Sequence, residues 1–142
     1  MGTMSSIDKV DPNEQSGYTQ ECKLDERQCR QKQHELKIYI DKYFKEKLSK
    51  GVDYTKVIIS NDMLIIRGER FLTEPEKYIV ATAEGNEAVN RARINVARQH
   101  SIDNMPYFEK FLGAKAIHET YMVEAKKDFW MHVIVFDRVL TD

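Results

Sequence analysis

The sequence has little of what small disulfide-stabilised or metal-stabilised proteins depend on. Its 142 residues include only two cysteines, Cys22 and Cys29, and three prolines. A disulfide framework needs more cysteines than these. A tetrahedral zinc site needs about four convergent ligands, and His34 offers a third at most. We therefore expect reduced thiols, no bound metal and no resident cofactor.

Long apolar runs and an excess of one charge are absent as well. The longest apolar runs, residues 63–66 and 133–136, are far shorter than the roughly 20 residues that cross a bilayer. The first residues do not resemble a signal peptide. Lys and Arg number 22 against 23 Asp and Glu, whereas nucleic-acid-binding domains usually carry a basic excess. These features predict a cytoplasmic protein that neither inserts into a membrane nor binds nucleic acid.

No catalytic motif is recognisable either. The chain lacks a Walker loop, a Rossmann glycine pattern, an HExxH sequence and the spacing of a Ser-His-Asp triad. His118 and His132 fall on opposite faces of a predicted hairpin because strand side chains alternate, so they do not form an acid–base pair. We identify no catalytic residue and favour a protein that is not an enzyme, with a hydrolase or transferase as a distant alternative.

The composition changes near residue 25. Residues 1–25 are polar and contain too few apolar side chains to offset the entropy of ordering, which predicts a flexible polar tail. Residues 26–142 carry helix and strand patterns and predict a single domain. The first helix is expected over residues 26–49, from apolar side chains at helical spacing. Gly51 is expected to end it in a left-handed conformation.

A first β-hairpin is expected next, with strands at residues 54–60 and 63–70 and a turn at Asn61 and Asp62. The second strand opens with four consecutive apolar residues, so both of its faces are apolar. A strand with one face in water alternates between apolar and polar side chains. We therefore expect something to cover the second face of this strand.

Two helices are expected between the hairpins. Thr73 and Glu76 match a capping box that opens the first of them. The longer helix is expected from about residue 87, behind Asn86 as its cap, and Pro106 is expected to kink or restart it. Its apolar face is predicted to consist of Val89, Ala92, Val96 and Ile102.

A second hairpin, residues 115–125 and 129–138, completes the chain. A two-residue loop at Lys126 and Lys127 would set its register. The expected cross-strand pairs are Val123 with Trp130, Tyr121 with His132, and Ile117 with Phe136. The core of this half is predicted to hold Trp130, Ile134, Phe136, Val123 and Ile117.

The helix-then-hairpin order occurs twice. Phe44 and Leu48 before the first hairpin have counterparts in Phe108 and Leu112 before the second. The predicted fold class is α+β, with the order α-β-β-α-β-β and a four-stranded, mostly antiparallel sheet packed against helices on one face. The placement of the two hairpins relative to each other stays open.

One stretch of the chain resembles a known family. It comprises DMLIIR at 62–67, FLT at 71–73, PEK at 75–77 and EG at 84–85, followed by Val89 and Arg93. This pattern is similar to that of the MpsC-like family of YbcI-like proteins over about residues 33–140, although Glu74 stands where the family often has a proline. The resemblance implies a small accessory protein without established enzymatic activity. Some members are encoded beside membrane systems for membrane-potential generation or inorganic-carbon uptake.

The sequence therefore predicts a non-enzymatic interaction protein that forms a homodimer and has a membrane protein of an ion or inorganic-carbon uptake system as a possible partner. The two-sided apolar strands motivate this hypothesis, together with four aromatic residues interpreted as exposed: Tyr39, Tyr43, Tyr107 and Tyr121. The alternative is a sensor of a small anion or other small ligand, bound by Arg67 and Arg93. Asp62 and Trp130 are further candidates for a ligand site or an interface.

Overall fold

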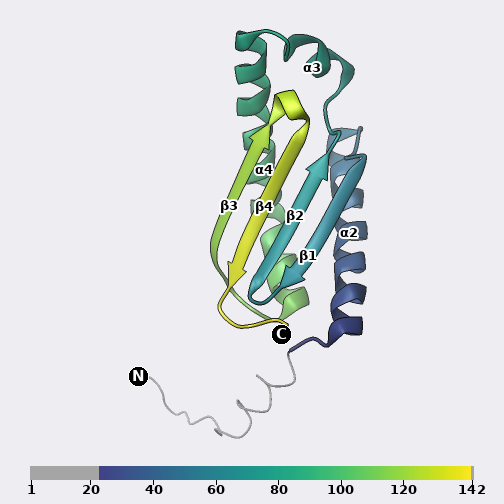
Figure 1. Cartoon of the computed structure of the whole chain (residues 1–142), viewed down its shortest axis with the longest axis vertical. Helices are drawn as coiled ribbons and strands as arrows, with labels where there is room; N and C mark the ends of the chain where they lie inside the picture. Colours follow the sequence, from purple (N-terminus) through teal and green to yellow (C-terminus); the bar gives the residue numbers. More distant parts are fainter. Residues whose placement is uncertain (1–22, 142) are drawn as a thin grey trace, which may run out of the picture.

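The computed structural model describes residues 23–141 and arranges them in two layers, a sheet and a helical layer (Figure 1). The elements in chain order are α2 (Glu26–Leu48), β1 (Tyr54–Ser60), β2 (Met63–Glu69), α3 (Glu74–Ile79), α4 (Ala83–Leu112), β3 (Ala116–Glu124), a short 3-10 turn (Ala125–Lys127) and β4 (Phe129–Phe136). The predicted α+β class and its helix-then-hairpin order are confirmed. Most of the predicted tail, including Cys22, lies outside the described residues.

The two hairpins meet through their second strands. The strand order is β1-β2-β4-β3, and every neighbouring pair is antiparallel. At the centre Ile65 pairs with Val133 and Gly68 with Trp130. The strand order therefore gives the relative placement of the two hairpins, which the sequence left open.

Helices α2 and α4 cover one face of the sheet only (Figure 1). The core lies between them and the side chains that the four strands point towards them. Its largest fully buried apolar members come from both helix-then-hairpin units: Leu36, Ile40, Leu64, Ile66, Phe108, Ile134 and Phe136. Burial of such side chains contributes roughly 1.5–3 kcal/mol each, so the core between the layers is the main source of stability.

The second hairpin has the predicted register over most of its length. Val123 pairs with Trp130 and Tyr121 with His132. The prediction was wrong at the open end, where a bulge between Ala116 and His118 brings Ala116 opposite Phe136. A bulge inserts one extra residue into a strand. Ile117 is that residue, and its side chain is 53% exposed instead of buried in the core.

The ends of α2 and the start of α4 differ from the sequence prediction. The residue with a positive φ after α2 is Ser49, not Gly51, because the last helical hydrogen bond runs from the Ser49 N–H to the Lys45 carbonyl. Helix α4 starts at Ala83, where the Thr82 hydroxyl accepts a hydrogen bond from the Gly85 amide. Asn86 is therefore inside the helix and is not its cap.

Pro106 lies inside a continuous α4, so the predicted restart of the helix at this residue was wrong. A proline inside a helix leaves the carbonyl four residues earlier without its amide donor. Here that carbonyl belongs to Ile102, on the exposed side of the helix, where water can satisfy it. The buried side of α4 keeps its packing through Phe108 and Leu112. Ile102 therefore does not belong to the apolar face of the helix, and the prediction was also wrong for Ala92, which is exposed.

The centre of the sheet contains one very close approach. Trp130 is buried on the helix side of β4, where its ring meets the Phe44 ring edge-on at 5.4 Å between centroids. A Cβ atom on Gly68 would lie 2.0 Å from the Trp130 Nε1 atom. Only glycine leaves room for the indole at this position.

We expect the substitution Gly68→Ala to destabilise the protein by about 1–3 kcal/mol, the usual range for overpacking a core. The added methyl group must displace the Trp130 ring from its contact with Phe44. Urea unfolding followed by Trp130 fluorescence measures the change. Gly51→Ala is the matched control, because its Cβ would have no neighbour closer than 3.7 Å. Equal effects of the two substitutions would contradict the packing argument.

Candidate functional site

The structure separates the two arginines of the anion-sensor hypothesis. Arg67 projects from β2 on the side of the sheet away from the helices, whereas Arg93 lies on α4. The Arg67 Nη2 donates to Glu69 Oε2 at 2.9 Å, and its guanidinium lies 5.6 Å from the centre of the Phe129 ring. The two guanidinium groups lie on opposite sides of the sheet and do not form a common site.

Arg93 is engaged within the fold. Its Nε donates to Glu76 Oε2 at 3.0 Å, its Nη2 donates to Glu76 Oε1 at 2.6 Å, and Nη2 also contacts the Phe71 carbonyl oxygen at 3.2 Å. Thr73 and Glu76 form the predicted capping box at the start of α3. Burial would raise the pKa of Glu76, but the hydrogen bonds from Arg93 and Thr73 outweigh this and lower it. Arg93 thus fastens the start of α3 to α4.

The structure also places the other residues singled out in the sequence, Asp62, Trp130 and Cys29. The Asp62 carbonyl oxygen accepts a hydrogen bond from the Phe136 amide at 2.8 Å, which ties the first turn to the end of β4. Trp130 belongs to the core. The Cys29 thiol contacts Gln33 and the Ile59 carbonyl, and burial raises its pKa. Within residues 23–141, no three His, Cys, Asp or Glu side chains are placed to hold a metal ion.

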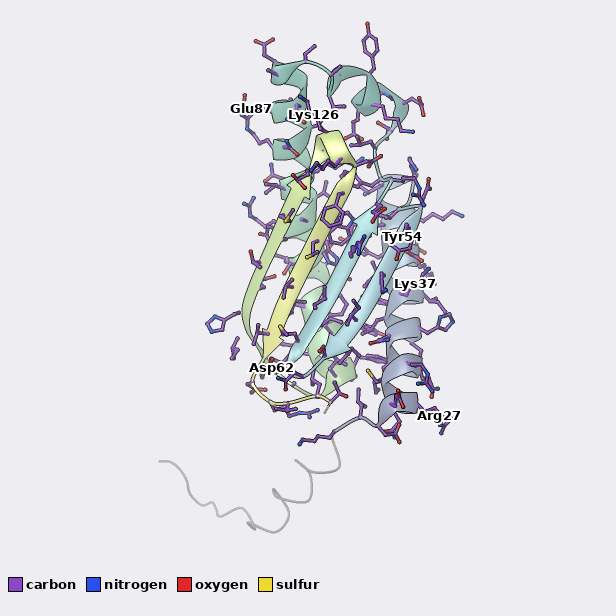
Figure 2. All side chains as sticks on the ribbon, in the orientation of Figure 1. Arg27, Lys37, Tyr54, Asp62, Glu87 and Lys126 are labelled. Carbon is purple, nitrogen blue, oxygen red and sulfur yellow. The ribbon has the colours of Figure 1, made fainter. Side chains whose placement is uncertain are left out.

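The sheet face away from the helices carries an array of apolar side chains. Each strand points four side chains to this side, in rows set by the strand register. No helix of the described residues lies over it (Figure 1). Figure 2 shows the array between Tyr54, near one end of β1, and Asp62 at the opposite turn. Eight apolar members are neighbours, and we call them the outer apolar face: Ile58, Met63, Ile65, Met122, Phe129, Met131, Val133 and Val135.

The two edges of the sheet are partly occupied by side chains. On β1 the Gln33 Oε1 accepts a hydrogen bond from the Ile59 amide at 2.8 Å. At the two ends of β3, Glu109 Oε2 accepts from the Ala116 amide and Asn90 Oδ1 from the Ala125 amide. Edge strands with free backbone groups invite pairing with another chain. These contacts occupy one backbone amide on β1 and one at each end of β3.

The four tyrosines interpreted as exposed lie on the helix side of the sheet and are half-buried. Tyr39 of α2 stacks on Tyr107 of α4, with ring centroids 3.8 Å apart. The Tyr43 hydroxyl donates to Asp103 Oδ2 at 2.6 Å, which also links α2 to α4. Tyr121 meets the His132 ring edge-on. These rings link the helices to each other and to the core. None of them is part of the outer apolar face.

A connected row of polar side chains runs from one of these rings, through three buried side chains of the core, to a carboxylate that is 38% exposed. We call it the polar chain: Tyr39, Asn104, His100, His132 and Glu119. Asn104 contacts the Tyr39 hydroxyl through Oδ1 and the His100 Nδ1 through Nδ2, both at 2.8 Å. The His100 Nε2 lies 3.2 Å from the His132 Nδ1, and the His132 Nε2 lies 2.8 Å from Glu119 Oε1.

The direction of these hydrogen bonds follows from the carboxylate at one end. Burial would raise the pKa of Glu119, but hydrogen bonds from Ser101 and His132 outweigh it and lower it, so the carboxylate is ionised and can only accept. His132 therefore donates from Nε2 and, when neutral, accepts at Nδ1. His100 then donates from Nε2 and accepts from Asn104, whose oxygen accepts from Tyr39. Every donor points towards Glu119.

The surroundings keep both histidines neutral. Burial lowers the pKa of His100 to about 3, with His132 adding to the decrease and Asp103 opposing it. Burial also lowers the pKa of His132, although the adjacent Glu119 opposes this. Both side chains are fully buried among aromatic rings. Buried polar groups of this kind are stable only when each has a partner, and the polar chain supplies one for each ring nitrogen.

Sequence reasoning missed His100, Asn104 and Glu119. One signal was present: His100 and Asn104 continue the helical spacing of the buried residues Val89, Ala97 and Phe108 along α4. A polar side chain within such a stripe indicates a buried polar network, because an unpartnered one would be costly. Glu119 carried no comparable signal, since its role depends on the pairing of β3 with β4.

Replacing Arg93 tests whether this residue is structural. We expect Arg93→Gln to lower the free energy of unfolding by about 2–3 kcal/mol, because it leaves the Glu76 carboxylate without its charged partner. The two side chains are only 10% and 21% exposed. Arg91→Gln is the control, since Arg91 pairs with Glu87 on the surface of the same helix and should change stability by less than about 0.5 kcal/mol. Similar values for both variants in urea titrations would refute the assignment.

No helix in residues 23–141 combines the length and the apolar character needed to cross a lipid bilayer. A family model described as "Na+-translocating membrane potential-generating system (MpsC)" matches residues 28–138. A curated relative from Bacillus subtilis (strain 168), "Uncharacterized protein YrhF", is 27% identical over 110 residues, which cover 77% of this chain and 90% of YrhF. No solved structure gives a significant match. Because the family match spans well over half of the sequence, the chain belongs to the MpsC family.

Proposed function

We propose that the protein is a non-enzymatic interaction module that forms a homodimer by packing two outer apolar faces against each other. The observation that carries this proposal is the uncovered sheet face itself. Eight apolar side chains are neighbours on it, and the helical layer lies entirely on the other side (Figure 1). Large exposed apolar patches on a folded domain usually mark a site of association.

The size of the face suits one protein–protein interface. Strands about 4.8 Å apart, with about 6.6 Å of strand for each outward side chain, give the eight apolar members a projected area on the order of 250 Å². Protruding side chains make the accessible area larger than this projection, and standard interfaces bury about 800 Å² per partner. Two such sheets would pack face to face about 10 Å apart, as in a β-sandwich.

A second copy is the partner that fits the charges of the face. Arg67 and Glu69 at its border pair with each other within one chain at 2.9 Å, so neither charge needs a partner from another molecule. The centre around Ile65 and Val133 is apolar. In a two-fold dimer the same surface meets itself, and the apolar centre of this face can do so without opposing like charges. Lys56 and Glu124, which also point to this side, lie on the edge strands β1 and β3.

The two alternatives, an enzyme and a sensor of a small anion, receive less support from the contacts within the structure. The apolar hollow between the helices is lined by Phe44, Leu48, Val96 and Trp130, and its charged member, Arg93, is bound to Glu76. A substrate site usually offers several convergent polar groups. A small-anion sensor built from Arg67 and Arg93 would need them on the same side of the sheet.

A dimerisation assay tests the proposal directly. We expect the full chain to elute as a dimer in size-exclusion chromatography with light scattering at about 50–100 µM. Ile65→Glu, at the centre of the outer apolar face, should give a folded monomer, because two carboxylates would be desolvated in the interface. Ile38→Glu is the matched control on the exposed surface of α2 and should leave the dimer intact. A monomeric wild-type protein, or an Ile65→Glu variant that remains dimeric, would contradict the dimer proposal.

We further propose that the module acts on the cytoplasmic side as an accessory of a membrane ion-translocating or inorganic-carbon uptake system. Support comes from the description of the family and from the resemblance noted in the sequence. Since no described helix crosses a membrane, such a role requires a membrane-protein partner.

The expected result is co-sedimentation of the full chain with membranes from cells that contain the integral components of that system, and loss of this association in cells that lack them. Quantitative immunoblotting of the membrane and supernatant fractions provides the measurement. The same distribution in both cell types would count against the accessory role and would leave the dimer proposal untouched.

A further inference from the structure

The polar chain joins four elements of the fold in a fixed hydrogen-bond direction. Tyr39 comes from α2, Asn104 and His100 from α4, His132 from β4 and Glu119 from β3. Each member has one arrangement of donors and acceptors that satisfies its neighbours, and the ionised Glu119 selects it. A proton added between the two histidines must therefore reverse the three hydrogen bonds from His132 back to Tyr39, while His132 continues to donate to Glu119.

We propose that the two buried histidines of the polar chain form a proton-binding site, and that uptake of one proton reverses the hydrogen bonds between His132 and Tyr39 and alters the contact between α2 and α4. The inference goes beyond the proposed dimer and does not depend on it.

The reversal balances with one proton and no other reactant. When both histidines are neutral, the hydrogen between the two imidazole rings is bonded to His100 Nε2, which lies 3.2 Å from His132 Nδ1. On protonation this N–H bond breaks and a new one forms at His132 Nδ1, while the proton taken up from water bonds to His100 Nδ1. His132 becomes the cation, and His100 stays neutral with its hydrogen on the other nitrogen.

In the protonated state, His132 is the more favourable place for the positive charge because of the side chains around it. Glu119 Oε1 lies 2.8 Å from its Nε2, so the cation forms a direct pair with a carboxylate. The His100 ring is instead surrounded by Tyr43, Phe44, Phe108 and Trp130. An ion without a contacting counter-charge is strongly disfavoured in such surroundings.

The other titratable groups that face the pair are few in the described part of the chain. From α2 they are the hydroxyls of Tyr39 and Tyr43, from α4 the Asp103 carboxylate, and from β3 Glu119 and the Tyr121 hydroxyl. Asp103 is already held by Tyr43 at 2.6 Å and by Gln99 at 2.8 Å. Burial lowers the pKa of His132 from its ordinary value, so uptake is expected below about pH 6.5.

The reversal changes the hydrogen bond of Tyr39, the member of the polar chain farthest from Glu119. Once His100 donates from Nδ1, Asn104 must turn its amide so that Oδ1 accepts from His100 and Nδ2 faces Tyr39. The Tyr39 hydroxyl then becomes an acceptor and loses the bond that it donates at 2.8 Å. Tyr39 stacks on Tyr107 at 3.8 Å, so the change acts on the main aromatic contact between α2 and α4.

Imidazole nitrogen NMR on the full, uniformly 15N-labelled chain tests this proposal. At pH 7 the two buried rings should both carry hydrogen on Nε2. On acidification one ring should become an imidazolium while the other shifts to the Nδ1–H form in the same transition. His34 and His118 are exposed, and the variants His34→Gln and His118→Gln identify their signals.

Glu119→Gln removes the counter-charge but keeps an oxygen that can accept from His132. It should lower the proton affinity of the pair at least tenfold, which moves the transition down by one pH unit or more. His118→Gln, on the same strand but on the other sheet face, is the matched control and should leave the transition in place. The proposal is overturned if both rings keep Nε2–H down to the pH of unfolding, if both become cations together, or if Glu119→Gln leaves the midpoint unchanged.

Discussion

The pairing of β2 with β4 is the contact on which the rest of the structure depends. Each helix-then-hairpin unit supplies one of these strands, and without their union neither unit has a closed core. Their register also places Gly68 under Trp130. Asp128 strengthens the same junction from the second turn, since its carboxylate accepts from the amides of Phe71 and Leu72 at 2.8 and 3.1 Å. The chain beyond β2 is thereby fixed to the end of the second hairpin.

One helical layer leaves this four-stranded sheet with two very different faces. Towards the helices β4 presents Trp130, His132 and Ile134, all buried. On the other side Met131 and Val133 are only half-buried by their neighbours in the sheet. Half-burial means that part of their apolar surface stays in water, and the hydrophobic effect favours removing it by association. This difference between the two faces is the basis of the dimer proposal.

The sequence was informative wherever a local rule determines the structure. The turn at Asn61 and Asp62 and the capping box of Thr73 and Glu76 follow from neighbours a few residues apart, and the pairing of Tyr121 with His132 follows from the position of the turn that joins their strands. The run of apolar residues in the central strands also predicted that both of their faces are apolar, as the structure has them. Within residues 23–141 no helix covers the second face, and its covering by a partner stays a prediction.

The sequence predictions failed where contacts between distant residues, or access to solvent, determine the local structure. Pro106 is tolerated because Ile102 faces water, which depends on how α4 sits on the sheet. The bulge at Ile117 shifts the end of the hairpin register, and no local signal marked it. The polar chain needs α2, α4, β3 and β4 in place before its members meet, so the sequence revealed at most that His100 and Asn104 occupy buried positions of a helix.

The two proposals concern opposite sides of the same strand. His132, the residue that holds the added charge, lies between Met131 and Val133, which point to the outer apolar face. A strand transmits a shift at one residue to its neighbours because the backbone hydrogen bonds of the ladder fix their relative positions. Glu119 and Thr120 stand in the same relation on β3, one facing the histidines and the other the outer side. Proton uptake and association therefore share a mechanical element, and any energetic coupling between them must pass through β3 and β4.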